Sequence, residues 1–138
     1  MKKVGEALSV HDVEYLEITG NPKQKGKVLE RFQLGQHERV LLLCVTDESA
    51  AGGNLTVANH AILLSPLLEP TKESYVAKET QAIGRIRRFG QSRTVQVWRF
   101  MSANTIDTEI FEQRTGRKID QDSLEVSMRT DEPTVVED

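Results

Sequence analysis

Cysteine is almost absent from this 138-residue sequence. Only Cys44 occurs, so no disulfide can form within the chain. Cys44 lies in the apolar run 40–45, so we expect a buried, reduced thiol in a reducing intracellular compartment. No apolar run approaches the roughly 20 residues that cross a bilayer. The first residues also lack the apolar region of a secretory signal, so we expect no membrane partner.

Sequence patterns that hold a triphosphate or a metal are also lacking. No Gly-x-x-x-x-Gly-Lys-Ser/Thr loop occurs, and such a loop is what cradles phosphates in many nucleotide hydrolases. The three histidines are widely separated and no Cys-x-x-Cys occurs, so we expect no metal site. The apolar run 40–45 is followed by Asp47 and Glu48, a pair that resembles the magnesium-binding acids of nucleotide hydrolases. An unrelated nucleotide-binding α/β domain that uses this pair is a minor alternative.

Charge divides the chain unevenly. Residues 119–138 carry seven acids and one base, whereas the first 118 residues carry 14 acids and 17 bases. We expect one domain at residues 1–118 and an acidic, disordered tail at 119–138. A mildly basic body permits contact with nucleic acid but does not require it.

Hydrophobic patterns predict strands that alternate with helices. Strands are expected at residues 13–18, 40–45, 61–64 and 95–100, and helices at residues 22–34, 81–90 and 104–117, with a loop at 65–74. This alternation is typical of an α/β fold with a three-layer parallel sheet. Sites in such sheets form at the carboxyl ends of strands, where the segments after the second and third strands begin.

The segment 81–91 is the most informative part of the chain. As a helix it would carry a polar and an apolar row side by side, the first with Gln81, Arg85 and Arg88 and the second with Ala82, Ile86 and Phe89. The apolar row would anchor the helix in a core, and Gly90 would end it in a left-handed cap. Two guanidiniums aimed at one spot suit a phosphate chain.

The pattern Gln-x-x-Gly-Arg-x-x-Arg-x-Gly-Gln over residues 81–91 resembles the sixth motif of the superfamily-two helicase-like ATPases, in the form used by the Swi/Snf group. Residues 49–58 resemble the fifth motif of the same group, Ala-Gly-x-Gly-x-Asn-Leu-Thr-x-Ala, with Gly52, Asn54 and Thr56 among the matches. Ala50 replaces the first glycine of that motif, so the loop would be strained there if it needs a positive φ. The resemblance covers residues 10–118.

This resemblance implies a RecA-like second lobe of a DNA-dependent ATPase and translocase, a nuclear protein of chromatin remodelling or DNA repair. ATP would lie between this lobe and a first lobe, in cis or in trans, that holds most of the Mg²⁺. DNA, and with it chromatin, would be the other partner.

The implied site residues fall in the two motifs. Arg85 and Arg88 would act as catalytic arginine fingers, with Gln81, Gly84 and Gln91 at the nucleotide and Gly52, Asn54 and Thr56 at DNA. Since the phosphate loop and a fourth-motif segment are missing, we expect a fragment or split gene product that hydrolyses no ATP alone. The alternative is a non-enzymatic relic lobe that binds DNA or protein through the same arginines.

Overall fold

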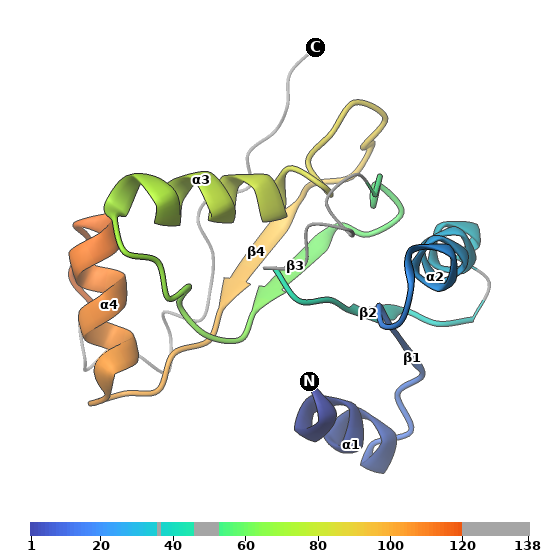
Figure 1. Ribbon diagram of the computed structural model, residues 1–138, viewed down its shortest axis with the longest axis horizontal. Coiled ribbons are helices and arrows are strands. Elements are labelled where there is room, and N and C mark those ends of the chain that lie inside the picture. The colour runs from blue at the N-terminus through green and yellow to red at the C-terminus, as the bar shows by residue number, and fades with distance from the viewer. Residues whose placement is uncertain (36, 46–52, 120–138) are drawn as a thin grey trace. The chain divides into compact units, whose positions relative to one another are not determined.

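The computed structural model describes residues 1–35, 37–45 and 53–119. The chain divides into two compact units, Met1–Val57 and Ala58–Asp138, and each is described by itself. Figure 1 labels their helices and strands. Several predicted residues lie outside the described ones, namely Asp47, Glu48, Ala50, Gly52 and the tail from residue 120 onward.

The first unit is built on two parallel strands. Strand β1 (Tyr15–Glu17) pairs with β2 (Val40–Leu42), with Leu16 opposite Leu41. The ladder continues for one more bond, from the amide of Ile18 to the carbonyl of Leu42 at 2.9 Å. The buried apolar side chains of this unit belong to Ile18, Phe32, Leu42 and Leu55. The predicted strands are confirmed in place and direction, but each is three residues long.

Helix α2 (Pro22–Leu34) connects these strands and has the bounds that the sequence predicts. Asn21 caps it, because its side chain accepts a hydrogen bond from the Gln24 amide at 3.0 Å while the Gln24 side chain accepts one from the Asn21 amide at 2.9 Å. This reciprocal pair satisfies two backbone donors that the first turn would otherwise leave open. Gly35 ends the helix with a φ of 60°.

Helix α1 (Lys2–Val10) does not follow from the hydrophobic pattern. Its one buried residue is Gly5, against which the Tyr15 side chain packs. A Cβ at Gly5 would lie 2.4 Å from the Tyr15 hydroxyl oxygen, so only glycine fits there without a shift. Val4 and Leu8 on the same face of α1 are half-buried, so the face that includes Gly5 is the one that packs.

The predicted burial of Cys44 is wrong, because its side chain is exposed. The apolar run suggested a strand through residue 45, but β2 ends at Leu42. Beyond that residue the chain leaves the ladder, and Cys44 no longer lies on a packed strand face.

The second unit also holds a parallel pair, β3 (His60–Leu63) and β4 (Gln96–Arg99), with Ile62 opposite Trp98. Helix α3 (Lys72–Ile83) lies between them in the chain, and α4 (Ile106–Thr115) packs against α3. Thr71 and Thr105 cap the two helices, and Gly116 ends α4 with a φ of 73°. The α/β class with parallel strands is thus confirmed, as two two-stranded sheets among the described residues.

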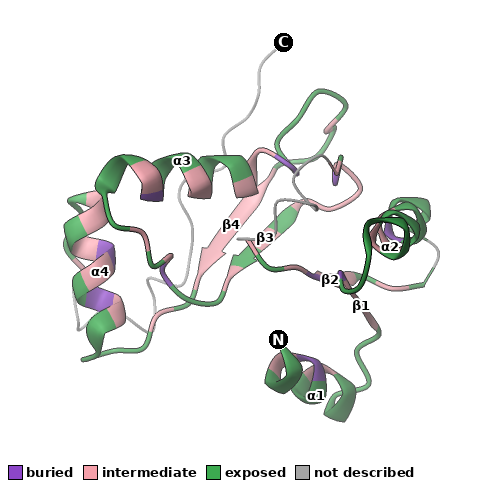
Figure 2. Cartoon of the chain, in the orientation of Figure 1, coloured by how far each residue is buried: buried purple, intermediate pink, exposed green. Residues whose placement is uncertain are grey.

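The core of the second unit surrounds Tyr75. This side chain is 2% exposed, and Phe111 is 8% exposed. Burial, with the nearby Glu79 carboxylate, raises the pKa of the Tyr75 hydroxyl above its ordinary value, against the opposing effect of Arg99. Glu79 on α3 accepts a hydrogen bond from the Arg99 guanidinium on β4 at 2.9 Å, which ties helix to strand. Figure 2 shows the buried residues on the facing sides of α3 and α4.

The prediction of a helix over residues 81–90 is wrong. Helix α3 starts at Lys72, directly after the Thr71 cap, and ends at Ile83. Residues 84–91 follow as successive turns, with bonds such as Arg88 amide to Ile86 carbonyl at 3.1 Å and Gln91 amide to Arg88 carbonyl at 3.0 Å. Gly90 does take the expected positive φ, at 95°, but it closes a turn and not a helix.

We expect Phe111→Ala to lower the free energy of unfolding by about 3 kcal/mol, because it leaves a cavity in the core of the second unit. Phe89→Ala is the matched control, since the same atoms are removed from a side chain that is 101% exposed. That variant should change stability by less than about 0.5 kcal/mol. Urea unfolding of the chain measures both, and equal effects would contradict the packing described here.

Candidate functional site

The predicted arginines lie on the segment between α3 and β4, residues 84–94, which we call the arginine loop. Gln81 is exposed in the last turn of α3, and Gly84 follows the helix as its cap. A Cβ on Gly84 would lie 3.0 Å from the Thr80 carbonyl oxygen, so glycine allows the turn to close tightly. The loop itself then carries Arg85, Arg88 and Gln91.

The two predicted fingers have opposite environments. Arg85 is 4% exposed and Ile86 beside it is 7% exposed, whereas Arg88 is exposed. The expectation of two guanidiniums on one helical face therefore fails, because the helix ends before either residue. Arg88 is available to a ligand, and Arg85 is a buried part of the loop's base.

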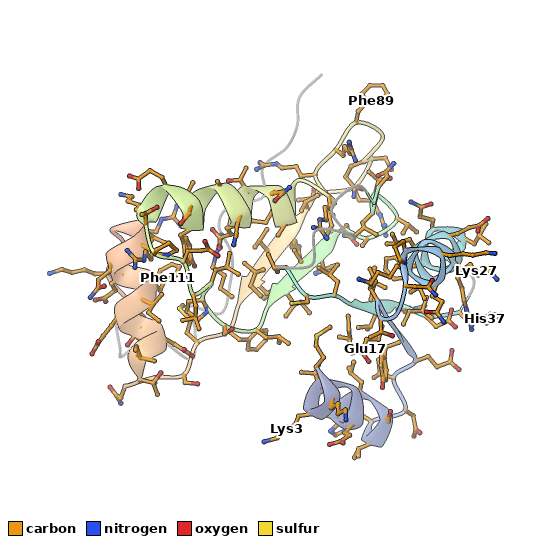
Figure 3. The ribbon with its side chains drawn as sticks, in the orientation of Figure 1. Lys3, Glu17, Lys27, His37, Phe89 and Phe111 are labelled. Atoms are coloured by element: carbon orange, nitrogen blue, oxygen red, sulfur yellow. The ribbon has the colours of Figure 1, made fainter. Side chains whose placement is uncertain are left out.

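Phe89 departs furthest from the sequence-based expectation. Its place in the apolar row predicted an anchor in the core, and Ile86 from the same row is indeed buried. Phe89 instead lies at the tip of the loop with its side chain directed away from the unit, as Figure 3 shows. Helical spacing ceases to apply after Ile83, so the row breaks between these two residues.

Gln91 fixes the far end of the arginine loop. Its side-chain amide donates hydrogen bonds to the carbonyl oxygens of Ala58 at 2.7 Å and Ile86 at 3.2 Å. Its side-chain oxygen accepts a bond from the Arg93 amide at 3.0 Å. The half-buried side chain of Gln91 thus joins three places: the segment just before β3, the base of the arginine loop, and the end of the loop that leads into β4.

The charge of the loop has one sign. Residues 80–106 contain no Asp or Glu and five arginines, which are Arg85, Arg87, Arg88, Arg93 and Arg99. Arg99 is paired with Glu79, so the excess positive charge belongs to the loop. Guanidiniums offer forked donors that match phosphate or carboxylate oxygens.

Asn54 and Thr56 of the fifth motif lie in the first unit, at the start of the described range 53–119. The Asn54 side chain accepts a hydrogen bond from the Thr56 amide at 3.2 Å, and the Asn54 carbonyl accepts one from the Gln33 side chain on α2. Leu55 between them is 4% exposed and anchors the turn. Asn54 is exposed and Thr56 half-buried, whereas Gly52 lies outside the described residues.

The described residues suit an anion better than a cation. Within residues 1–35, 37–45 and 53–119, no group of three or more His, Cys, Asp or Glu side chains gathers closely enough to hold a metal ion. In the same ranges no helix is long and apolar enough to cross a membrane. The arginine loop, by contrast, presents cationic hydrogen-bond donors that suit an anionic ligand.

Comparisons with known proteins find similar sequences and a similar fold. No family model matches the chain. It is 46% identical over 114 residues to a DNA (cytosine-5-)-methyltransferase, DMT5, of Cryptococcus neoformans, covering 81% of this chain. It is 34% identical over 110 residues to the ATP-dependent helicase IRC20 of Saccharomyces cerevisiae (80% of this chain), and 30% identical over 103 residues to the human DNA repair and recombination protein RAD54-like (75%).

The chain spans only a small part of these relatives, with 5% of DMT5, 7% of IRC20 and 13% of RAD54-like. Among solved structures it resembles the C-terminal part of the Fun30 ATPase domain, with a TM-score of 0.68 and 21% identity. That match covers 90% of this chain and 39% of the other. A likeness at this identity shows the fold, which is RecA-like.

We expect Gln91→Ala to destabilise the second unit by about 1–2 kcal/mol, because two carbonyl acceptors lose a donor in a half-buried site. The loop should also open locally, so the amides of residues 85–93 should exchange with deuterium faster than in the unsubstituted chain. Hydrogen exchange with mass spectrometry measures this. Gln81→Ala, on the exposed last turn of α3, is the control. An unchanged exchange rate in Gln91→Ala would show that Gln91 does not hold the loop in place.

Proposed function

We propose that this chain, a homologue of the Swi/Snf-type ATP-dependent helicases with the RecA-like fold of their C-terminal ATPase region, supplies arginine and DNA contacts to an ATP site shared with a first lobe. ATP with Mg²⁺, held mainly by that first lobe, provides the phosphoryl group that is cleaved. The chain's own contribution is to stabilise negative charge and to couple the site to DNA.

Arg88 is the residue that carries this proposal. Its guanidinium is exposed on a loop that Gln91 holds at both ends and that contains no carboxylate to neutralise it. A permanently charged, forked donor in such a place can meet the phosphate oxygens on which charge develops during hydrolysis. The helicase relatives, which act with ATP, support this assignment.

Arg85 takes a different part in the proposal. Since it is 4% exposed, it acts by positioning the base of the loop and reaches phosphate only if the loop rearranges. Gln81 and Gly84 lie at the carboxyl end of α3, just before the loop, and are proposed to border the nucleotide. Gln91 is also proposed to act at the nucleotide site, by holding the arginine loop in place.

DNA contacts are proposed for the fifth-motif turn. The Asn54 side chain caps the Thr56 amide, which fixes the turn, and leaves the exposed Asn54 and the Thr56 hydroxyl as candidate partners for the DNA backbone. Gly52 is proposed to share this role. We propose that the chain belongs to a nuclear protein of DNA repair or chromatin remodelling, and the similarity to DNA repair proteins supports this.

The test is a chimera in which this chain's residues replace the 110 matched residues of IRC20. We expect Arg88→Ala to lower the DNA-stimulated kcat for ATP hydrolysis by about 10³-fold or more, as the loss of an arginine finger does elsewhere. Arg117→Ala, at an exposed arginine two residues after the end of α4, is the control and should stay within about threefold of the parent, since surface substitutions away from a site are nearly neutral.

Two outcomes would remove Arg88 from the catalytic role. One is a loss of less than tenfold in the chimera. The other is steady ATP hydrolysis by this chain alone that Arg88→Ala abolishes, because the site would then need no first lobe. If Arg88→Ala weakens DNA binding and leaves hydrolysis intact, the chain is a binding module and not half of an enzyme.

A further inference from the structure

Phe89 is the most exposed large apolar side chain among the described residues, at 101% of its free accessibility. It lies at the tip of the arginine loop, away from α3 and β4 (Figure 3). Other apolar side chains of the second unit are exposed as well, such as Leu68 at 83%. Phe89 differs from Leu68 because it is aromatic and follows two arginines, Arg87 and Arg88, and arginine is one of the residue types enriched at interface hot spots.

The loop that carries Phe89 is fixed before any partner binds. Gln91, two residues away, holds the loop through the Ala58 and Ile86 carbonyls, and Ile86 on the other side is buried. The tip between these two anchors is only a few residues long. A side chain presented on such a short, pinned segment loses little freedom on binding, and this preorganisation favours affinity.

The positive charge around Phe89 limits the kinds of partner that could bind it. With no acid in residues 80–106, the loop would repel the same loop on a second copy of the chain. The partner should therefore offer an apolar hollow bordered by carboxylates. Duplex DNA offers the negative charge but keeps its base faces stacked, so a phenylalanine finds no apolar hollow there without unstacking.

The position of Phe89 next to Arg88 in the chain points to one such partner. Consecutive Cα atoms are about 3.8 Å apart, so Phe89 travels with Arg88 wherever that residue reaches. If Arg88 reaches a nucleotide held by a first ATPase lobe, the adjacent ring meets the surface of that lobe beside the nucleotide. We propose that Phe89 docks into an apolar, acid-rimmed hollow of the first lobe and holds the two lobes together; this rests on the proposed function.

The test replaces Phe89 by a photoreactive residue in the same IRC20 chimera, Phe89→p-benzoylphenylalanine. Irradiation should link this position to the part of IRC20 that precedes the replaced segment, at a site that mass spectrometry identifies. Leu68→p-benzoylphenylalanine, also apolar and exposed in the second unit, is the matched control and should give no such link.

Phe89→Ala gives an independent readout. If the ring stabilises lobe closure, the KM for ATP should rise at least threefold while kcat at saturating ATP stays within twofold, because added nucleotide restores closure. Leu68→Ala should change neither constant. This signature differs from that of Arg88→Ala, whose loss falls on kcat, so the docking of Phe89 and the catalytic role of Arg88 can fail separately.

Three results would overturn the docking proposal. One is a cross-link from position 89 to DNA, which would make Phe89 a nucleic-acid contact. Another is no cross-link, or a link to IRC20 no stronger than that from position 68. The third is an unchanged KM for ATP in Phe89→Ala.

Discussion

The hydrogen bonds of the Gln91 side-chain amide are the interactions on which the shape of the arginine loop depends. Helix α3 ends at Ile83, seven residues before Gly90, and no regular element holds the chain between there and β4. The bonds from Gln91 to the Ala58 and Ile86 carbonyls replace that support. They allow Arg88 and Phe89 to stand in solvent on a loop whose base, at Arg85 and Ile86, is packed.

Several elements could be predicted because local signals and the fold agree. Asn21, Pro22 and Gly35 bound α2 through capping and backbone geometry alone, and Thr105 does the same for the start of α4. The parallel pairing of the strands followed from their alternation with helices. For the helix ends, the determining contacts lie within a few residues of one another.

The rest could not be predicted, because it depends on contacts that periodicity does not contain. Helix α1 packs Gly5 against Tyr15. Because α3 ends at Ile83, the later residues of both apparent helical rows, Arg88 and Phe89 among them, lie in a loop. Cys44 is exposed because β2 stops at Leu42. The motif assigned Arg85 and Arg88 the same environment, and only the structure separates the buried Arg85 from the exposed Arg88.

The most direct measurement is a structure of the IRC20 chimera with DNA, Mg²⁺, ADP and a fluoride mimic of the transferred phosphoryl group. We predict that the guanidinium of Arg88 lies about 2.8 Å from the mimic, the length of a charge-assisted hydrogen bond. Arg85 should remain inside the base of the loop. A mimic contacted only by groups of the first lobe, with Arg88 still in solvent, would contradict the account.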